Sequence, residues 1–503
     1  MLLHIKHSRK VYDIEVDESV SGQQLKELVF KETGVPPERQ KLIAKGKQVK
    51  PDSTLQSLNI VDGQTLMMVG TAQPPPAVQR AIDEKAKAEA GESKDADHKD
   101  ELLGSAYYRP TGADEEGEKI PVGLTNIGNT CYANAILQAL HTVPELGTAL
   151  TNYKGVNPLI KSWAQLLPKF SIPKPLGTET PTPYSFLNSL RQKAPQFGEI
   201  GELGSPKQQD AEELWTILFS ELNDSQDPQI QDAVSDFSGS LDVEVKKLDG
   251  TTTKTTDSFN KLYCHINIRT NFLRDGLLAS LSESRETGEG SGSFETVTKR
   301  VSSFPKYLTV QFVRFFWRKD TKTNSKILRK VAFPLQLDIG TLATDELVAK
   351  VAPAKQAFRE LENAVEESKR NLRRSKFRKL DALDSQKTKE SAELDSEETN
   401  EEKRDKEKVE NLRKVLTSKI EESHVNPSHS PLGVYNLQAI VTHQGMSADS
   451  GHYQCFTKNT EKANSWWRFN DDTVTEVEDS RIAQLAGGGA SDSALILLYK
   501  SAE

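Results

Sequence analysis

A long stretch that cannot build a hydrophobic core divides this 503-residue chain into two folding units. The stretch begins at Ala72, carries three consecutive prolines at 74–76, and continues to about residue 120 in alanine, lysine, glutamate, aspartate and glycine. Because it offers few large apolar side chains to bury, it favours a flexible linker that tethers one domain to another. We therefore expect a small domain over residues 1–71, a flexible linker over 72–120 and a large domain over 121–500.

The first 70 residues carry the pattern of a small α+β domain. Residues 2–16 alternate apolar and polar side chains in two runs with a polar turn between them, which predicts two short strands. Residues 22–34 predict an amphipathic helix that turns Leu25, Leu28 and Val29 inward and ends at Gly34. Further short strands are expected between residues 40 and 70, so that one helix packs on a small mixed sheet.

The large domain should open with a helix that begins at a cysteine. Asn126, Gly128 and Asn129 favour turns and left-handed backbone, whereas residues 133–140 are mostly apolar helix formers. Cys131 then stands at the helix N-terminus, where the positive end of the helix dipole favours the nucleophilic thiolate. A buried structural cysteine is the alternative, and the polar residues before Cys131 weigh against it.

The pattern then changes from helices to strands. Residues 207–224 predict a helix with one apolar face and with Asp210 in its first turn. Gln209 and Asp210 could simply cap this helix, with no further role. Residues 307–318 give the clearest strand, with alternate residues forming an apolar face that consists of Leu308, Val310 and Phe312. Residues 327–340 are expected to resume the sheet.

Residues 345 to about 428 interrupt this strand pattern with dense charge of both signs and sparse leucine and valine. Pairs of opposite charge four residues apart favour helices, but helices poor in core-forming side chains. The segment is either a helical arm that binds a partner or a solvated insertion, and we favour the insertion. Strands return from about residue 433 to 500, so the large domain is expected to be α+β, with helices first and an antiparallel sheet second.

Composition argues against several classes of protein. The net charge of −8 is spread over segments of mixed sign, which offers no basic face to a nucleic acid. No run approaches the roughly 18 apolar residues that cross a bilayer, and the N-terminus lacks the features of a secretory signal. The three cysteines Cys131, Cys264 and Cys455 lie far apart and form no C-x-x-C pair, so neither a zinc site nor a disulfide framework is expected. This cysteine usage fits a reducing compartment, and we expect a protein of the cytoplasm and nucleus.

A nucleophilic cysteine needs a base, a group that orients the base, and donors for an oxyanion. The candidates for the base are His141, His265, His424, His429, His443 and His452. His452 stands out because a loop rich in serine and glycine precedes it and a strand follows. Asn470 or Asp471, at the end of a nearby strand, could hold the second nitrogen of its ring. Alternatively, His452 is structural and the Asn-Asp pair merely forms a turn.

The first domain closely resembles ubiquitin over its whole length. The resemblance is carried by Gln40, Lys41, Leu42, Ile43, Gly46, Lys47, Gln48, Thr54, Leu55, Asn59, Ile60, Thr65 and Leu66. It implies a β-grasp fold, but residues 68–71 replace the diglycine tail, so we expect binding in place of cleavage or conjugation. Ile43 and Val69, with Met67 nearby, match ubiquitin's hydrophobic recognition patch, although Ile43 and Val69 could instead belong to the core of the sheet.

The large domain resembles the ubiquitin-specific proteases. GLTNIGNTCYANAILQ at 123–138 is similar to their cysteine box and QQDAEEL at 208–214 to their second box. LQAIVTHQG, SGHYQCF, WWRFND and ALILLYK resemble the histidine box and the closing strands. The four boxes follow the family's order across most of residues 121–500. They imply a papain-like domain with thumb, palm and fingers, and the zinc-binding C-x-x-C pairs that many members carry in the fingers are missing here.

Carried over residue by residue, the resemblance implies a role for each site residue. Cys131 is the nucleophile, His452 the general base and then acid, and Asn470 the residue that orients His452. Asn126 matches the oxyanion residue, and Asp471 stands as a substitute for Asn470 because many members have aspartate as the third residue. The implied reaction is thiol-dependent hydrolysis of the isopeptide bond at the terminal glycine of ubiquitin, with no metal or cofactor.

A ubiquitin-like domain in front of such a protease most resembles the proteasome-associated member of the family. The implied partners are ubiquitin, ubiquitinated proteins and the proteasome regulatory particle, the last bound through the ubiquitin-like domain. Residues 316–326 and 444–450 match loops that cover the groove for ubiquitin's tail, so we expect low activity until docking on the proteasome moves them. The competing hypotheses are a non-catalytic ubiquitin-binding regulator of the proteasome and a cysteine hydrolase of another kind, such as a glutaminase.

Overall fold

The structure, a computed structural model, describes most of the chain in two compact units, Met1–Pro110 and Thr111–Glu503, and each is taken by itself. The described residues are 1–502 apart from 8–9, 18–19, 34–36, 38–40, 45–46, 50–62, 70–118, 176–178, 202–203, 205, 248, 287–293, 319–322, 386–399, 427, 448–449 and 489–491. Except for its last two residues, the predicted linker over 72–120 lies outside the described residues.

The first unit consists of a sheet and one helix, as its sequence pattern predicts. Its elements are β1 (Leu2–His7), β2 (Lys10–Glu15), α1 (Gly22–Thr33), β3 (Lys41–Ala44), β4 (Lys47–Gln48) and β5 (Thr65–Val69). The sheet order is β2-β1-β5-β3-β4, with β1 and β5 parallel and the other described pairs antiparallel. Leu25 and Val29 of α1 are fully buried against sheet residues that include Leu3, Ile5, Leu42 and Leu66.

The three residues expected to form a recognition patch lie on β3 and β5. Ile43 pairs with Met67 and Lys41 with Val69, whereas buried Leu42 pairs with Met68. The backbone register therefore sets Ile43, Met67 and Val69 one residue out of phase with Leu42 and Leu66 of the core. The side chains of the three patch residues are outside what the structure describes.

The second unit begins with a layer of helices. They are α3 (Cys131–His141), α4 (Pro144–Asn152), α5 (Pro158–Phe170), α6 (Tyr184–Lys193), α7 (Ala211–Asn223) and α8 (Pro228–Ser235), with the short strands β6 (Lys119–Ile120) and β7 (Lys174–Pro175) beside them. Ten of the eleven residues of α3 are buried, because small and apolar side chains allow neighbours on every side. Within the described ranges, none of the helices is both long and apolar enough to cross a bilayer.

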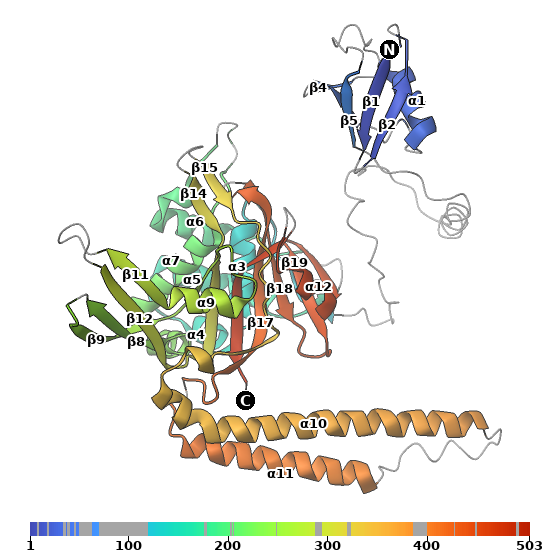
Figure 1. The fold of residues 1–503 in the computed structure, drawn as a ribbon. Helices are drawn as coiled ribbons and strands as arrows, with labels where there is room; N and C mark the ends of the chain where they lie inside the picture. Colours follow the sequence, from blue (N-terminus) through green and yellow to red (C-terminus); the bar gives the residue numbers. More distant parts are fainter. Residues whose placement is uncertain are drawn as a thin grey trace. The chain divides into compact units, whose positions relative to one another are not determined.

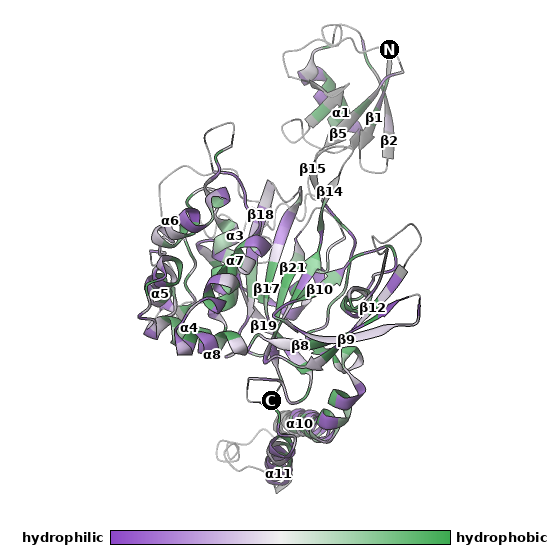
Figure 2. Ribbon diagram, turned by 90° about the vertical axis from the view of Figure 1, so that its left-hand side faces the viewer, coloured by the Kyte–Doolittle hydropathy of each residue, from purple (hydrophilic) through white to green (hydrophobic). Residues whose placement is uncertain are grey.

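The helices cover one face of an eight-stranded sheet (Figure 1). Its strands are β10 (Leu262–His265), β13 (Tyr307–Val313), β16 (Gln336–Asp338), β17 (Val434–Ser447), β18 (Ser450–Lys458), β19 (Ser465–Asn470), β20 (Thr473–Glu478) and β21 (Ser493–Ser501). The expected antiparallel sheet is mixed at one edge, because β10 runs parallel to β13. The strand β13 is buried on both faces, Thr309 included, since apolar clusters lie on both sides of the sheet. Figure 2 shows the hydrophobic residues concentrated along its central strands.

A second sheet projects from the main one (Figure 1). It contains β8 (Gly239–Lys247), β9 (Thr252–Phe259), β11 (Ser282–Glu286) and β12 (Phe294–Ser303) in the order β11-β12-β8-β9, with α9 (Leu273–Ser280) near its base. Leu241, Val243, Val297 and Val301 join this sheet to one of the apolar clusters of the main sheet. In the part of the chain that the structure describes, no three metal-ligating side chains gather here or elsewhere.

Residues 327–340 differ from the predicted strand. Only β16, three residues long, pairs with the sheet, along the edge of β17. The preceding residues form backbone hydrogen bonds with other segments: Val331 N–H donates to the carbonyl of Ala486, and Ala332 N–H donates to that of Asn271. Pro334 has no N–H to offer to a ladder. The apolar pattern of this segment therefore reflects burial of a connection between elements.

The charged segment forms two helices, α10 (Asp345–Ser385) and α11 (Asn400–Glu422), which run side by side away from the sheets (Figure 1). Helix formation was predicted, but the expectation of an insertion apart from the core is wrong for the start of α10. Its first turns bury Leu347 and Val351 in the apolar cluster that the two sheets share, where α10 contacts β12, and Phe358 packs with Leu432 and Ala502. The apolar residues, though sparse, recur on one face, and that face anchors the helical pair.

Candidate active site

The loop before α3 is folded around the side chain of Asn126. Its Oδ1 accepts hydrogen bonds from Gly128 N (3.0 Å) and Thr130 N (3.2 Å). Gly128 and Asn129 adopt left-handed backbone with φ of +106° and +50°, as their residue types predict. The chain then enters α3 at Cys131, which is the first residue of the helix.

The sulfur of Cys131 faces donors from two other segments. Tyr453 N–H of β18 and the Nε2 amide of Gln208, just before α7, each lie 3.5 Å from Sγ. Such donors stabilise negative charge on sulfur. Cys131 is nevertheless only 2% exposed, so little of its surface is open to a substrate in this conformation.

His452 stands between Cys131 and Asn470. Its Nε2 lies 2.5 Å from Asn470 Oδ1, across the neighbouring strands β18 and β19. A hydrogen bond with Cys131 is the largest cause that raises the pKa of His452 to about 9, against the opposing effect of burial. Because Asn470 engages Nε2, the nitrogen left for Cys131 is Nδ1. The ring is therefore held at both nitrogens, and with this raised pKa it is the charged imidazolium, protonated on both nitrogens, at neutral pH.

Asp471 contacts the loop before the cysteine. Its carboxylate accepts hydrogen bonds from Asn126 Nδ2 (2.9 Å) and Asn134 Nδ2 (2.8 Å), and its backbone carbonyl accepts from Leu124 N (3.0 Å). Asp471 has a left-handed backbone with φ of +52°, which sends its side chain to this loop while Asn470 meets His452. The arrangement requires glycine at 123, because a Cβ there would collide with the carbonyl oxygens of Asp471 and Asp472.

The structure thus brings the predicted residues into two connected groups. Cys131, His452 and Asn470 form one, and Asn126 and Asp471 form the other, so Asp471 supports the loop in place of substituting for Asn470. Sequence reasoning missed Gln208, Asn134 and the N–H of Tyr453. Gln208 lay within the quoted second box, and Asn134 is a polar residue one helical turn after Cys131, which is the signal that could have found it.

The two segments expected to be loops are the ends of strand pairs. Residues 316–326 fall in the hairpin of β14 (Phe315–Arg318) and β15 (Thr323–Lys326), and residues 444–450 extend β17 and β18 through a register shift between Gln444 and Ser447. The polar residues of β15 and of 444–450 concealed the strand pairing, whereas β14 falls within the strand that is predicted over residues 307–318. The tips, residues 319–322 and 448–449, are outside the described residues.

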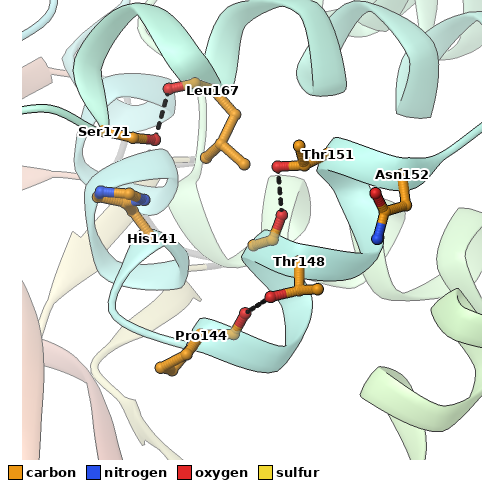
Figure 3. Close-up of a pocket in the computed structure, with 8 residues that line it drawn as sticks. His141, Pro144, Thr148, Thr151, Asn152, Leu167 and Ser171 are labelled. Atoms are coloured by element: carbon orange, nitrogen blue, oxygen red, sulfur yellow. Dashed lines mark hydrogen bonds between the residues drawn. The ribbon is translucent and has the colours of Figure 1, made fainter.

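A separate pocket lies at the opposite end of α3 (Figure 3). It has a volume of about 340 Å³ and is lined by residues of α3, α4 and α5 that include His141, the last residue of α3. The ten-residue rise of the helix puts this pocket about 15 Å from Cys131. Thr148, Thr151 and Ser171 each donate to a carbonyl four residues earlier, so these hydroxyl protons are not available to a ligand. The catalytic chemistry is therefore assigned to the Cys131 site.

Comparison with known proteins agrees with this geometry. Residues 122–499 match the family model described as ubiquitin carboxyl-terminal hydrolase, and residues 3–73 match the ubiquitin family. Ubiquitin carboxyl-terminal hydrolase 6 of Schizosaccharomyces pombe is 33% identical, over 99% of this chain and 98% of its own length. Ubiquitin carboxyl-terminal hydrolase 6 of Arabidopsis thaliana is 32% identical with the same coverage, and ubiquitin carboxyl-terminal hydrolase 14 of Caenorhabditis elegans is 29% identical over 99% of this chain and 93% of its own length.

The fold and the site define a hydrolase of the cysteine type. The chain belongs to the ubiquitin carboxyl-terminal hydrolase family and carries a domain of the ubiquitin family at its N-terminus. It is a deubiquitinase, and the expected fold class, a ubiquitin-like domain followed by a ubiquitin-specific protease domain, is confirmed.

Proposed function

We propose that the protein hydrolyses isopeptide bonds at the C-terminal glycine of ubiquitin, on substrates held at the proteasome in the cytoplasm and nucleus. The observation that carries the reaction is the convergence of Cys131, His452 and Asn470 in a chain of this family. A sulfur beside a protonated imidazole is poised as a nucleophile, and the same imidazolium is the acid that the leaving amine requires.

The reaction follows from these positions. The thiolate of Cys131 attacks the glycine carbonyl, a carbon–sulfur bond forms and the carbonyl oxygen becomes an oxyanion. His452 donates its proton to the lysine amine, and the carbon–nitrogen bond breaks to leave a thioester. His452 then takes a proton from water, which attacks the thioester, and returns it to the departing sulfur of Cys131. Asn470 keeps the ring oriented through both steps.

Asn126 is suited to bind the oxyanion. One hydrogen of its Nδ2 amide is engaged by Asp471, and an amide nitrogen carries a second hydrogen. The side chain is exposed on the loop that leads into Cys131, so this second hydrogen can face the reacting carbonyl. Asp471 serves as the residue that fixes the donor in place.

Docking on the proteasome regulatory particle through Ile43, Met67 and Val69 is proposed to activate the enzyme. Cys131 is nearly covered, His452 lies on β18 of the β17–β18 hairpin, and β15 of the other hairpin packs against β17. A substrate tail needs access to the sulfur, so movement of these hairpins is the step that docking would supply.

Hydrolysis of ubiquitin-coumarin, with and without added proteasome, tests this function. We expect a low rate for the free protein, a clear increase with proteasome, and loss of both rates in Cys131→Ala. An Ile43→Ala variant should keep the free rate and lose the increase. Equal rates with and without proteasome would rule out activation, and activity that survives Cys131→Ala would rule out the mechanism. No Cys131-dependent rate under either condition would favour a non-catalytic ubiquitin-binding regulator of the proteasome.

A further inference from the structure

A buried lysine lies beside the active site without a direct carboxylate partner among the described residues. Lys326, the last residue of β15, is 6% exposed, and its Nζ donates to the carbonyl of His443 and lies 3.2 Å from His443 Nδ1. Burial, with repulsion from Arg314 and a smaller attraction to Asp492, lowers the pKa of Lys326 to about 8. Burying a cation costs free energy of folding, so a buried lysine at this position indicates a function.

The partner of Lys326 is a fully buried histidine that the reaction does not use. His443 lies on β17, opposite Tyr453 of β18, and its ring packs edge-on against Tyr453 (4.7 Å between centroids) and Phe315 of β14 (5.2 Å). Burial and the nearby charges of Lys326 and His452 lower the pKa of His443 to about 3. The ring is therefore neutral, and Nδ1 is assigned as the acceptor for Lys326.

The other side of the His443 ring faces the turn that precedes the catalytic base. A Cβ added to Gly451 would lie 2.6 Å from His443 Nε2, and the ring also interacts with the backbone of Ser450. His443 thus touches Gly451, the residue before His452, and Tyr453, the residue after it. Tyr453 N–H in turn donates to Cys131 Sγ.

We propose that Lys326 and His443 are positioning residues of the active site, a role that rests on the proposed hydrolysis by Cys131 and His452. Lys326 fixes the ring and the carbonyl of His443. The ring then holds residues 450–453 so that His452 and the Tyr453 N–H face the sulfur. Since Lys326 belongs to β15, the same contact ties the β14–β15 hairpin to β17, the strand that pairs with the His452 strand β18.

The first test is kinetic, on the full chain with ubiquitin-coumarin in the presence of proteasome. Lys326→Met keeps the length of the side chain and removes its charge and donors. We expect kcat to fall at least about tenfold with KM within about twofold, because the geometry of the cysteine–histidine pair matters in the chemical step. His443→Asn should recover part of the activity lost in His443→Ala, since its Oδ1 can take the place of Nδ1. Lys458→Met, at the far end of β18, is the matched control and should retain the wild-type kcat. A wild-type kcat in Lys326→Met would overturn the proposal.

The second test needs no ubiquitin. The rate at which iodoacetamide alkylates Cys131 is measured against pH, with Cys131→Ala as background for the other two cysteines. The wild-type profile should contain a step near pH 9 from His452, and Lys326→Met should move that step toward pH 6.5 as the cysteine–histidine contact loosens. An unchanged step overturns the positioning role. A shifted step in a protein that never hydrolyses ubiquitin-coumarin would support the positioning role while the proposed function fails.

Folding is controlled within the same set of variants. Burial lowers the pKa of Lys326, which means that burying its charge costs free energy of folding. Replacement by methionine removes this desolvation cost and should leave the melting temperature at or above the wild-type value. A lower melting temperature for Lys326→Met, with parallel losses of kcat and of folded protein, would mean that the contact serves stability alone and would also overturn the proposal.

Discussion

Asn126 Nδ2 donates to the carboxylate of Asp471 at 2.9 Å and so joins the loop before the catalytic cysteine to the turn after β19. The adjacent residue, Asn470 at the end of β19, holds His452. Two consecutive side chains therefore serve two parts of one reaction: Asn470 orients the base, and Asp471 orients the proposed oxyanion donor. Asn134, buried in α3, secures Asp471 from a third direction.

Replacing Asp471 by asparagine should lower kcat by about tenfold to a hundredfold with little change in KM. An amide side chain at position 471 has one acceptor oxygen where the carboxylate has two, so its NH2 group would face the Nδ2 group of either Asn126 or Asn134. Two donors repel each other, and Asn126 would be displaced from the oxyanion. Asp472→Asn is the control, because Asp472 bonds only Thr473 with its side chain in the described contacts and should keep the wild-type rate. Equal rates for both variants, measured with ubiquitin-coumarin, would contradict the role of Asp471.

The orienting role of Asn470 predicts different results for two substitutions. Asn470→Ala should reduce kcat by about tenfold or more, since His452 loses the acceptor at Nε2. Asn470→Asp keeps an acceptor there and adds a charge that favours imidazolium, so it should retain activity within a fewfold and keep the pKa of His452 high. If the alanine variant were as active as the aspartate variant, another group would have to orient His452.

Asp210 should make folding stability depend on pH between about 4 and 6. It is the N-cap of α7, and burial, together with the nearby charges of Glu212 and Glu213, raises its pKa from 3.8 to about 6. Between these values the folded protein binds more protons than the unfolded chain, so stability falls as pH rises and is lowest above pH 6. Asp210→Asn keeps a capping oxygen and removes the charge, and above pH 6 it should be more stable than wild type by about 2 kcal/mol. Asp210→Ala should be less stable than Asp210→Asn by about 1 kcal/mol. Urea denaturation at pH 4 and pH 7.5 measures both differences, and a pH-independent gap between wild type and Asp210→Asn would refute the assignment.

Gly451 should resist substitution more than a glycine whose surroundings are open. Its φ of +136° disfavours other residues, and a Cβ would also collide with the carbonyl of Gln444 and the ring of His443. Gly250, with φ of +85° and no atom near its added Cβ, is the matched control for backbone strain alone. Gly250→Ala should cost about 1 kcal/mol of stability and no activity, whereas Gly451→Ala should lower kcat as well, because it displaces the residue beside His452. Similar kcat values for the two variants would contradict this.

Local pattern was enough to predict much of the fold and the chemistry of the site. The helix that begins at Cys131 and the helices α10 and α11 follow from features within a few residues of one another. Local context singled out His452 and either Asn470 or Asp471 as candidates, but the resemblance to a known family was needed to choose Asn470, to add Asn126 and to join them to Cys131.

Contacts between distant segments account for the rest. The role of Asp471 depends on a left-handed backbone that turns two neighbouring side chains in different directions, and a sequence does not show where such a turn points. The polar strand β15 and the polar extensions of β17 and β18 beyond Gln444 pair through backbone bonds, which leave no apolar signature. Lys326 looks like a surface residue in a polar segment, yet the fold buries it against His443, more than a hundred residues later.

The most direct measurement is reaction of the full-length protein with ubiquitin vinyl sulfone in the presence of proteasome, followed by mass spectrometry of the labelled peptide. This account predicts one adduct, on Cys131, that disappears in Cys131→Ala and forms slowly in His452→Ala. An adduct on Cys264 or Cys455, or no adduct on Cys131 when the proteasome is present, would contradict it.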